Sequence, residues 1–150
     1  MKLAEALQRR ADLNREIDQL SSRLNNNMLV QDGEKPNESP KELFNELNSR
    51  LDELQDLMTR INITNASVKA EGKTLTELIA LRDVLNKKIT VYKNAVYQAS
   101  LNTSRARNTE IKVLATIDVP SFQKEIDRLS KQLRETDNLI QSTNWTTELM

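Results

Sequence analysis

The sequence predicts a mainly α protein, an antiparallel bundle of four long helices arranged as helical hairpins, with a small two-stranded β ribbon. Apolar residues recur at steps of three and four in four long segments, which is the pattern of helices packing side by side. Hydrophobic residues make up 37% of the 150 residues, which suits narrow stripes along helices better than a thick core. We expect a single domain over residues 1–150.

The first predicted helix covers residues 2–25 and ends in three consecutive asparagines, which favour turns. Its apolar row is Leu3, Ala6, Leu13, Ile17, Leu20 and Leu24. Arg10 falls in the same row, so the pattern places a guanidinium in the helix seam.

The second predicted helix covers residues 40–63 and shows the strongest periodicity in the chain. Ser39, Pro40 and Glu42 form a typical start, with a capping hydroxyl, a proline in the first turn and an acid at the third position. The row that we expect to be buried is Phe44, Leu47, Leu51, Leu54, Met58 and Ile61, with Asn65 continuing it.

The third and fourth predicted helices cover residues 75–101 and 119–142. The row of the third is Leu78, Leu85, Ile89, Tyr92, Val96 and Ala99, with Arg82 in register. The row of the fourth is Val119, Phe122, Ile126, Leu129, Leu133 and Ile140. The rest of the chain is a polar tail, in which we expect Trp145 to dock on a helix groove.

Two short segments between the helices predict the ribbon. Residues 28–31 are apolar and precede an Asp-Gly turn, and residues 110–117 are rich in β-branched side chains. We expect these segments to pair, within one chain or between two subunits, because an isolated strand has no partner for its backbone.

The composition argues against several classes of function. Basic and acidic residues balance at 22 each, and the small basic cluster of Arg105, Arg107 and Lys112 has no aromatic residues between its members, so we expect no nucleic-acid partner. The chain has no histidine and no cysteine, which removes imidazole bases, thiolates and the common zinc ligands. We interpret Asp52 and Asp56, one helical turn apart, as solvated charges rather than metal ligands, and we expect no cofactor.

Targeting signals are also missing from the pattern. No segment approaches the roughly 20 apolar residues of a spanning helix, and charges interrupt the apolar residues of the first segment. We therefore expect a cytoplasmic protein without a membrane partner.

The stretch Gly72-Lys73-Thr74 before a helix is similar to the end of a nucleotide-binding P-loop. A P-loop requires a glycine five residues before Gly72, where this chain has Ser67. We interpret the stretch as a turn at Gly72 followed by a Thr74–Glu77 capping box.

The polar residues that remain are candidates for a ligand site. Arg10 and Arg82 lie in helix seams, where an unpaired charge costs several kcal/mol, so Asp12, Asp83 or a facing carboxylate is expected to pair with them. Arg60 and Asn65 place hydrogen-bonding groups near the end of the second helix. The candidate polar site is therefore Arg10, Arg60, Asn65, Arg82 and Asp83, although ion pairing and helix capping explain the same residues.

Several segments in the same order resemble a bacterial family labelled septicolysin. They are "MKLAEAL", "VQDGEKPNESP", "RINITN", "GKTLTELIALRDVL", "IKVLATIDV" and "NWTTEL". The resemblance implies a mostly helical, oligomeric protein without an established biochemical role, and the label implies a cytolysin. It implies no catalytic residues.

Three hypotheses follow for the function. The first is a non-enzymatic interaction or scaffold protein that self-assembles as a homo-oligomer, because a narrow stripe on a long helix leaves apolar surface to bury. The second is a module or enzyme that binds a small anion at the candidate polar site. The third is the lytic role of the septicolysin label.

Overall fold

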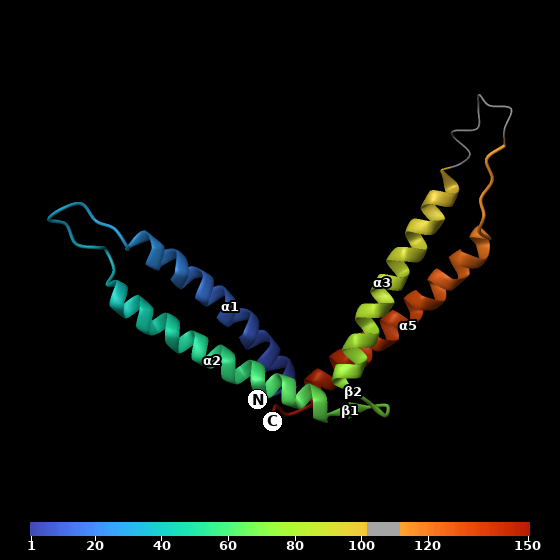
Figure 1. Ribbon diagram of the computed structural model, residues 1–150. Helices are drawn as coiled ribbons and strands as arrows, with labels where there is room; N and C mark the ends of the chain where they lie inside the picture. The colour runs from blue at the N-terminus through green and yellow to red at the C-terminus, as the bar shows by residue number, and fades with distance from the viewer. Residues whose placement is uncertain (102–111) are drawn as a thin grey trace. The chain divides into compact units, whose positions relative to one another are not determined.

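The computed structural model describes residues 1–101 and 112–150, and within them it contains four long helices and a two-stranded ribbon. The elements are α1 (Leu3–Asn26), α2 (Pro40–Ser67), β1 (Lys69–Ala70), β2 (Lys73–Thr74), α3 (Leu75–Ser100) and α5 (Val119–Thr146), as Figure 1 shows. The helices pack in antiparallel pairs, so the predicted mainly α class with paired hairpins and a small ribbon is confirmed.

The chain divides into two compact units. Unit 1 comprises Met1–Val68 with Thr143–Met150, and unit 2 comprises Lys69–Ser142. The single domain over residues 1–150 stays a prediction.

In unit 1 the helices α1 and α2 form a hairpin, and α1 buries the row that its sequence predicts. Leu3, Leu13 and Leu20 are buried in this row, while Arg10 and Ile17 are half-buried. At the loop end of the hairpin Leu20 and Leu24 cluster with Leu43 of α2, against which Leu47 packs. The apolar steps of α1 therefore place it correctly against its neighbour.

The face of α2 that packs against α1 is rotated from the predicted one, so that Leu43 and Leu57 are buried in place of Phe44 and Met58. The buried residues of α2 are Leu43, Leu57, Ile61 and Thr64, and Leu47 and Leu54 are half-buried. Phe44, Leu51 and Met58, which were expected in the seam, are exposed by 44%, 43% and 45%. The prediction was wrong here because α2 has apolar residues on both sides of the row through Leu47 and Leu54, and α1 covers one of these sides.

The connection between α1 and α2 is an irregular loop, not a strand. Asn27, which is buried, holds it: its Nδ2 donates to the Arg23 carbonyl at 2.8 Å, and its Oδ1 accepts from the Glu38 N–H at 3.0 Å. Residues 28–31 contain no strand, and Met28, Leu29 and Val30 are exposed. The predicted strand over 28–31 is therefore wrong.

In unit 2 the helices α3 and α5 pack through the rows expected for them. Leu85 and Ile89 of α3 cluster with Leu129 of α5. Farther along, the rings of Tyr92 and Phe122 form a tilted aromatic contact. Their centroids lie 5.3 Å apart and their planes make an angle of 37°. This pair closes the hairpin toward the end of α3.

The observed ribbon lies immediately before α3, where no strand was predicted. Lys69 pairs with Thr74 and Ala70 with Lys73, antiparallel. Glu71 and Gly72 between them have φ values of 50° and 82°, the positive angles that a two-residue type I′ hairpin turn requires.

The predicted strand over 110–117 is wrong in the residues that the structure describes. Residues 112–117 are irregular, and 110–111 lie outside the described residues. Arg105 and Arg107 also lie outside them.

The last helix is longer than the sequence suggested, since α5 continues to Thr146 instead of ending near residue 142. Trp145 is consequently helical, and its side chain is 63% exposed, so the expectation that it docks the C-terminal segment is wrong. Leu149 is buried instead.

Candidate interaction face and polar sites

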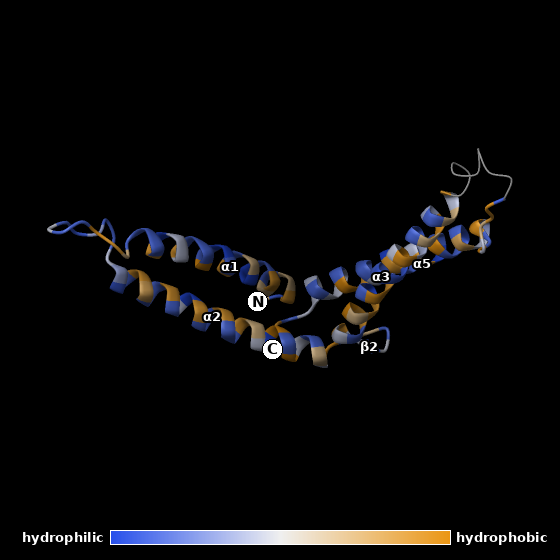
Figure 2. Cartoon of the chain, turned by 45° about the horizontal axis from the view of Figure 1, so that its top comes forward, coloured by the Kyte–Doolittle hydropathy of each residue, from blue (hydrophilic) through white to orange (hydrophobic). Residues whose placement is uncertain are grey.

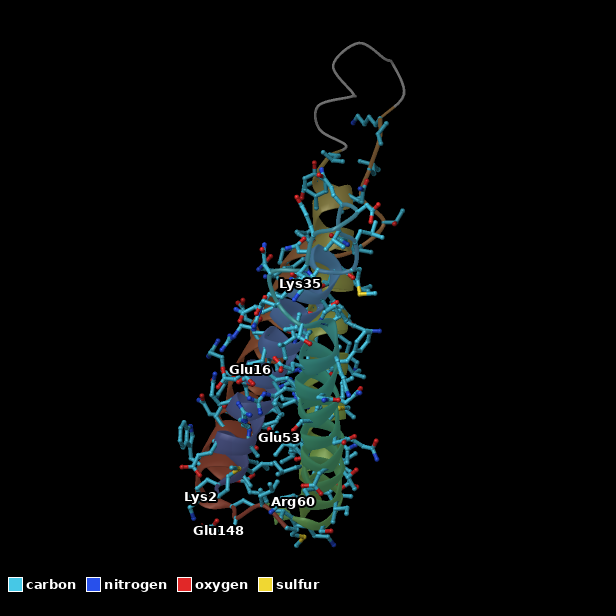
Figure 3. The ribbon with its side chains drawn as sticks, turned by 90° about the vertical axis from the view of Figure 1, so that its left-hand side faces the viewer. Lys2, Glu16, Lys35, Glu53, Arg60 and Glu148 are labelled. Atoms are coloured by element: carbon cyan, nitrogen blue, oxygen red, sulfur yellow. The ribbon has the colours of Figure 1, made fainter. Side chains whose placement is uncertain are left out.

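The strongest polar feature of unit 1 is a network of four charges that joins α1 to α2. Arg9 of α1 donates to both carboxylate oxygens of Glu53 on α2, with Nε–Oε1 at 2.7 Å and Nη2–Oε2 at 2.9 Å. Arg9 Nη1 also donates to Glu16 at 2.7 Å, and Arg50 Nε of α2 lies 2.9 Å from the other oxygen of Glu16. Glu16 and Glu53 are labelled on the neighbouring helices in Figure 3.

The bidentate contact changes the protonation of its members. Hydrogen bonds from Arg9 hold the pKa of Glu53 below its usual value, against a smaller opposing effect of desolvation. Hydrogen bonds to Glu53 and Glu16 raise the pKa of Arg9 further. Both partners therefore stay charged, and the planar guanidinium fork fixes the stagger of the two helices.

The sequence analysis missed this network because it selected the neighbouring arginine. Within the described part of the chain, the half-buried side chain of Arg10 has no ion pair, and Asp12 pairs with Arg15 instead. Arg9 and Glu16 lie seven residues apart, at the edge of the α1 seam nearest Glu53. The seven-residue spacing of opposite charges was the sequence signal that could have found it.

Phe44, Leu51 and Met58 form what we call the α2 outer row. They follow each other at intervals of seven residues, so they lie on one face of the helix. The side chains that flank this row away from α1 are exposed and mostly uncharged: Asn45, Asn48, Asp52, Gln55 and Thr59. Figure 2 shows hydrophobic residues recurring along α2 between hydrophilic ones. The outer row is an apolar strip that no described residue of unit 1 buries.

Two of the other candidate site residues, Arg60 and Asn65, also belong to unit 1. Arg60 Nε donates to the backbone oxygen of Met150 at 2.9 Å, and its Nη1 lies 4.0 Å from Asp56. Asn65 is half-buried near the end of α2. Arg60 thus binds the backbone of the C-terminal residues through a hydrogen bond.

Arg82 and Asp83 belong to unit 2 and pair with each other. Arg82 Nη2 and Nε donate to Asp83 Oδ1 at 3.1 and 3.2 Å, and Arg82 Nη1 lies 3.8 Å from Asp137 on α5. Both kinds of partner proposed from the sequence, the adjacent aspartate and a facing carboxylate, are present. That all five candidates form one site stays a prediction.

No pattern in the sequence predicts how residues 1–3 and 147–150 meet in unit 1. The Leu3 N–H donates to the Thr147 carbonyl, and the Leu149 N–H donates to the Met1 carbonyl, both at 2.9 Å. Lys2 Nζ lies 2.6 Å from Glu148, and Figure 3 shows the two residues together. These contacts bind residues 147–150 to the start of α1.

Thr64 of α2 completes this terminal contact. Its side chain is fully buried, its Oγ1 donates to the Arg60 carbonyl at 2.8 Å, and the same oxygen accepts from the Met150 N–H at 3.0 Å. The sequence signal that could have predicted this contact is a threonine in an apolar row at the end of a helix, since a buried hydroxyl needs hydrogen-bond partners.

The Gly72-Lys73-Thr74 stretch forms a turn followed by the N-terminal cap of α3, as its spacing predicted. The Thr74 hydroxyl accepts from the Glu77 N–H at 3.2 Å, and the Thr74 N–H donates to the Glu77 carboxylate at 2.6 Å, which lowers the pKa of Glu77. Lys73 stands beside a cleft of about 340 Å³ in unit 2. Its other lining residues are Ala70, Glu71, Leu78, Leu81, Gln132, Glu135, Thr136 and Leu139, so carboxylates accompany the lysine.

Two features are absent from the described residues. They contain no cluster of three or more histidine, cysteine or acidic side chains placed to hold a metal ion. In the same residues, no helix has the length and apolar character needed to cross a bilayer.

Comparisons with known proteins agree with this description. The model of a family of unknown function, DUF6847, matches residues 10–149. A functionally unknown conserved protein from Corynebacterium diphtheriae, solved by crystallography, is similar at 38% identity and a TM-score of 0.88, over 100% of this chain and 99% of that one. Among curated proteins no match was found.

Proposed function

The chain belongs to the DUF6847 family of unknown function, and we propose that it is a non-enzymatic interaction or scaffold protein that assembles with copies of itself. One observation supports this most directly: Phe44, Leu51 and Met58 of the α2 outer row are exposed in line on one face of the helix. Isolated exposed apolar residues are common on proteins, but an ordered row on one helix face marks a contact surface. We propose a cytoplasmic location for it.

The charged residues near the seams support the same proposal. Arg9, Arg50 and Arg82 each contact carboxylates of their own unit. Charges that satisfy each other between helices set helix register and need no ligand. These contacts support a structural role for the three arginines.

Light scattering of the purified protein tests the proposal. One chain has a mass of 17.2 kDa, and we expect a species of at least twice that mass at micromolar concentration. An assembly also makes the melting temperature depend on protein concentration. A particle of one-chain mass with a concentration-independent melting temperature would contradict self-assembly.

The second candidate is a module or enzyme that takes a small anion near Arg10, Arg60, Asn65, Arg82 and Asp83. The observation that favours it is Arg10, which is half-buried without an ion pair among the described residues. Phosphate should then raise the melting temperature of the wild type, and Arg10→Met should abolish that shift. Arg82→Met distinguishes the two candidates: lost thermal stability supports a structural role, whereas a normal fold with lost phosphate binding supports a site.

The third candidate, lysis of membranes, comes from the septicolysin label. Release of a trapped dye from liposomes is the direct test, with heat-denatured protein as the control. No release above that control would remove this candidate.

A further inference from the structure

The α2 outer row is symmetric about its middle residue. Phe44 and Met58 each lie seven residues from Leu51, so the row extends over roughly 21 Å at about 1.5 Å per residue. Building on the proposed self-assembly, we propose that a second copy of this chain packs its α2 antiparallel against the α2 outer row, with Leu51 at the two-fold axis.

Two-fold symmetry allows the two copies of α2 to run parallel or antiparallel, and the residue pairs that each direction forms favour the antiparallel one. A two-fold dimer joins the same patch on both subunits, so each residue of the patch must suit the residue that the axis brings opposite. With Leu51 on the axis, Phe44 meets Met58 of the second copy at both ends of the row. An aromatic ring and a thioether attract each other, and the flexible methionine adapts its shape to the ring.

The flanks of the row are mostly uncharged, so a second copy meets few like charges there. Asp52, the residue next to Leu51, is the exception, because the axis places it on the same flank as Asp52 of the second copy. Asn48 and Gln55 border Leu51 on the side away from α1, and both are exposed. The two-fold axis places Asn48 beside Gln55 of the second copy, where each amide can donate and accept a hydrogen bond. Asp52 is the single charged residue among the five flanking side chains named above, in a chain with 29% charged residues. Depletion of charge is characteristic of the centre of a protein interface.

The comparable row of unit 2 does not suit self-association. Val84 and Val91 of α3 are also seven residues apart and exposed by 50% and 64%. Between them, however, Lys87 and Lys88 flank the row and are themselves exposed. A second copy docked antiparallel at this site brings its own lysines against these, and like charges repel. This row is therefore the matched control for the α2 outer row.

Cysteine crosslinking tests the contact, because the chain has no cysteine of its own. Leu51→Cys places a thiol on the proposed axis, and oxidation should convert most of the protein to a covalent dimer. Ser49→Cys is the control, since Ser49 is exposed and lies about 200° around the helix from Leu51, at roughly 100° per residue. We expect it to stay largely uncrosslinked at the same concentration.

The direction of packing is tested by mixing two variants. Phe44→Cys alone should crosslink poorly, because the two copies of that residue lie about 21 Å apart along antiparallel helices at about 1.5 Å per residue. A refolded mixture of Phe44→Cys and Met58→Cys should form the covalent heterodimer. Efficient crosslinking of Phe44→Cys to itself would overturn the antiparallel arrangement.

A charge placed in the row provides an independent measurement. Leu51→Lys should reduce the mass in light scattering to that of one chain while far-UV circular dichroism keeps its helical signal. Val84→Lys should leave the assembly intact. If the wild type assembles and Leu51→Lys assembles as well, this surface is overturned but the proposed function is not. The same holds if Leu51→Cys crosslinks no more than Ser49→Cys. A wild type that has one-chain mass overturns both.

Discussion

The two hairpins bury similar rows of leucine and isoleucine but join their helices through different polar groups. In unit 1, Arg9 and Glu53 connect α1 to α2 through two hydrogen bonds of 2.7 and 2.9 Å. In unit 2, the charge contact between α3 and α5 is longer, with Arg82 and Asp137 3.8 Å apart. The aromatic pair Tyr92–Phe122 adds a packing contact between the same helices. Both hairpins pack through apolar rows, and the charge contact between the helices is shorter and more directional in unit 1.

The segments that lead into α2 and α3 also differ. In unit 1 a long loop held by Asn27 leads to α2, whereas in unit 2 a short two-stranded ribbon and a reciprocal capping box fix the first turn of α3. Variants in matched positions can break or sharpen this comparison.

The largest effects should come from the apolar seams. Leu13 in unit 1 is 0% exposed, and Leu129 in unit 2 is 2% exposed. Replacing either by alanine removes packed methyl groups and leaves a cavity, which should lower the free energy of unfolding by about 2–5 kcal/mol. Urea unfolding followed by circular dichroism measures this loss.

The same two variants test the predicted single domain. If residues 1–150 unfold as one domain, Leu13→Ala and Leu129→Ala should shift one common transition. Two transitions, each sensitive to one variant, would show that the hairpins unfold separately.

The turn of the ribbon should show the next effect. Gly72→Ala places a Cβ at a φ of 82°, in space where it meets no neighbouring atom, so the strain is confined to the backbone. We expect a loss of about 1 kcal/mol, because a left-handed backbone disfavours alanine by roughly that amount. Gly33→Ala in the loop of unit 1, at a φ of 83°, is the matched variant. An unchanged melting temperature for Gly72→Ala would contradict a type I′ turn.

Two buried threonines compare the polar contacts of the units. Thr64→Val removes the acceptor of the Met150 N–H and should cost about 1 kcal/mol, the usual net value of one hydrogen bond. Thr136 in unit 2 donates to the Gln132 carbonyl of its own helix. Thr136→Val should change the free energy of unfolding less, because that carbonyl already belongs to the helix. Equal losses in thermal unfolding would contradict a special role for Thr64.

The smallest effect should be the pH dependence of the Arg9–Glu53 contact. The folded chain holds the pKa of Glu53 below its usual 4.5, so the contact stabilises the fold above that pH and loses its contribution as the pH falls below it. NMR titration of Glu53 should show the lowered pKa, and Arg9→Met should raise it toward its usual value. Arg128→Met in unit 2 should leave it unchanged. A Glu53 that titrates normally in the wild type would contradict the bidentate contact.

The candidate sites were harder to predict than the helices. The Thr74–Glu77 box is local, with both partners within three residues, and the sequence predicted it correctly. Arg82 and its carboxylates were also within reach, because Asp83 is adjacent. The Arg9–Glu53 contact joins residues 44 apart, and the choice between Arg9 and Arg10 depends on the rotation of α1 against α2.

The sequence by itself determined the starts and the antiparallel pairing of the four long helices that the structure describes, because caps and apolar steps act within a few residues of each other. Tertiary structure decided which side of α2 faces α1, since both sides are apolar and a helix can turn either toward its neighbour. It also decided where the ribbon lies: residues 28–31 found no partner strand, whereas Lys69–Ala70 and Lys73–Thr74 are joined by a turn short enough to pair them. The outer row of α2 is what that rotation left exposed.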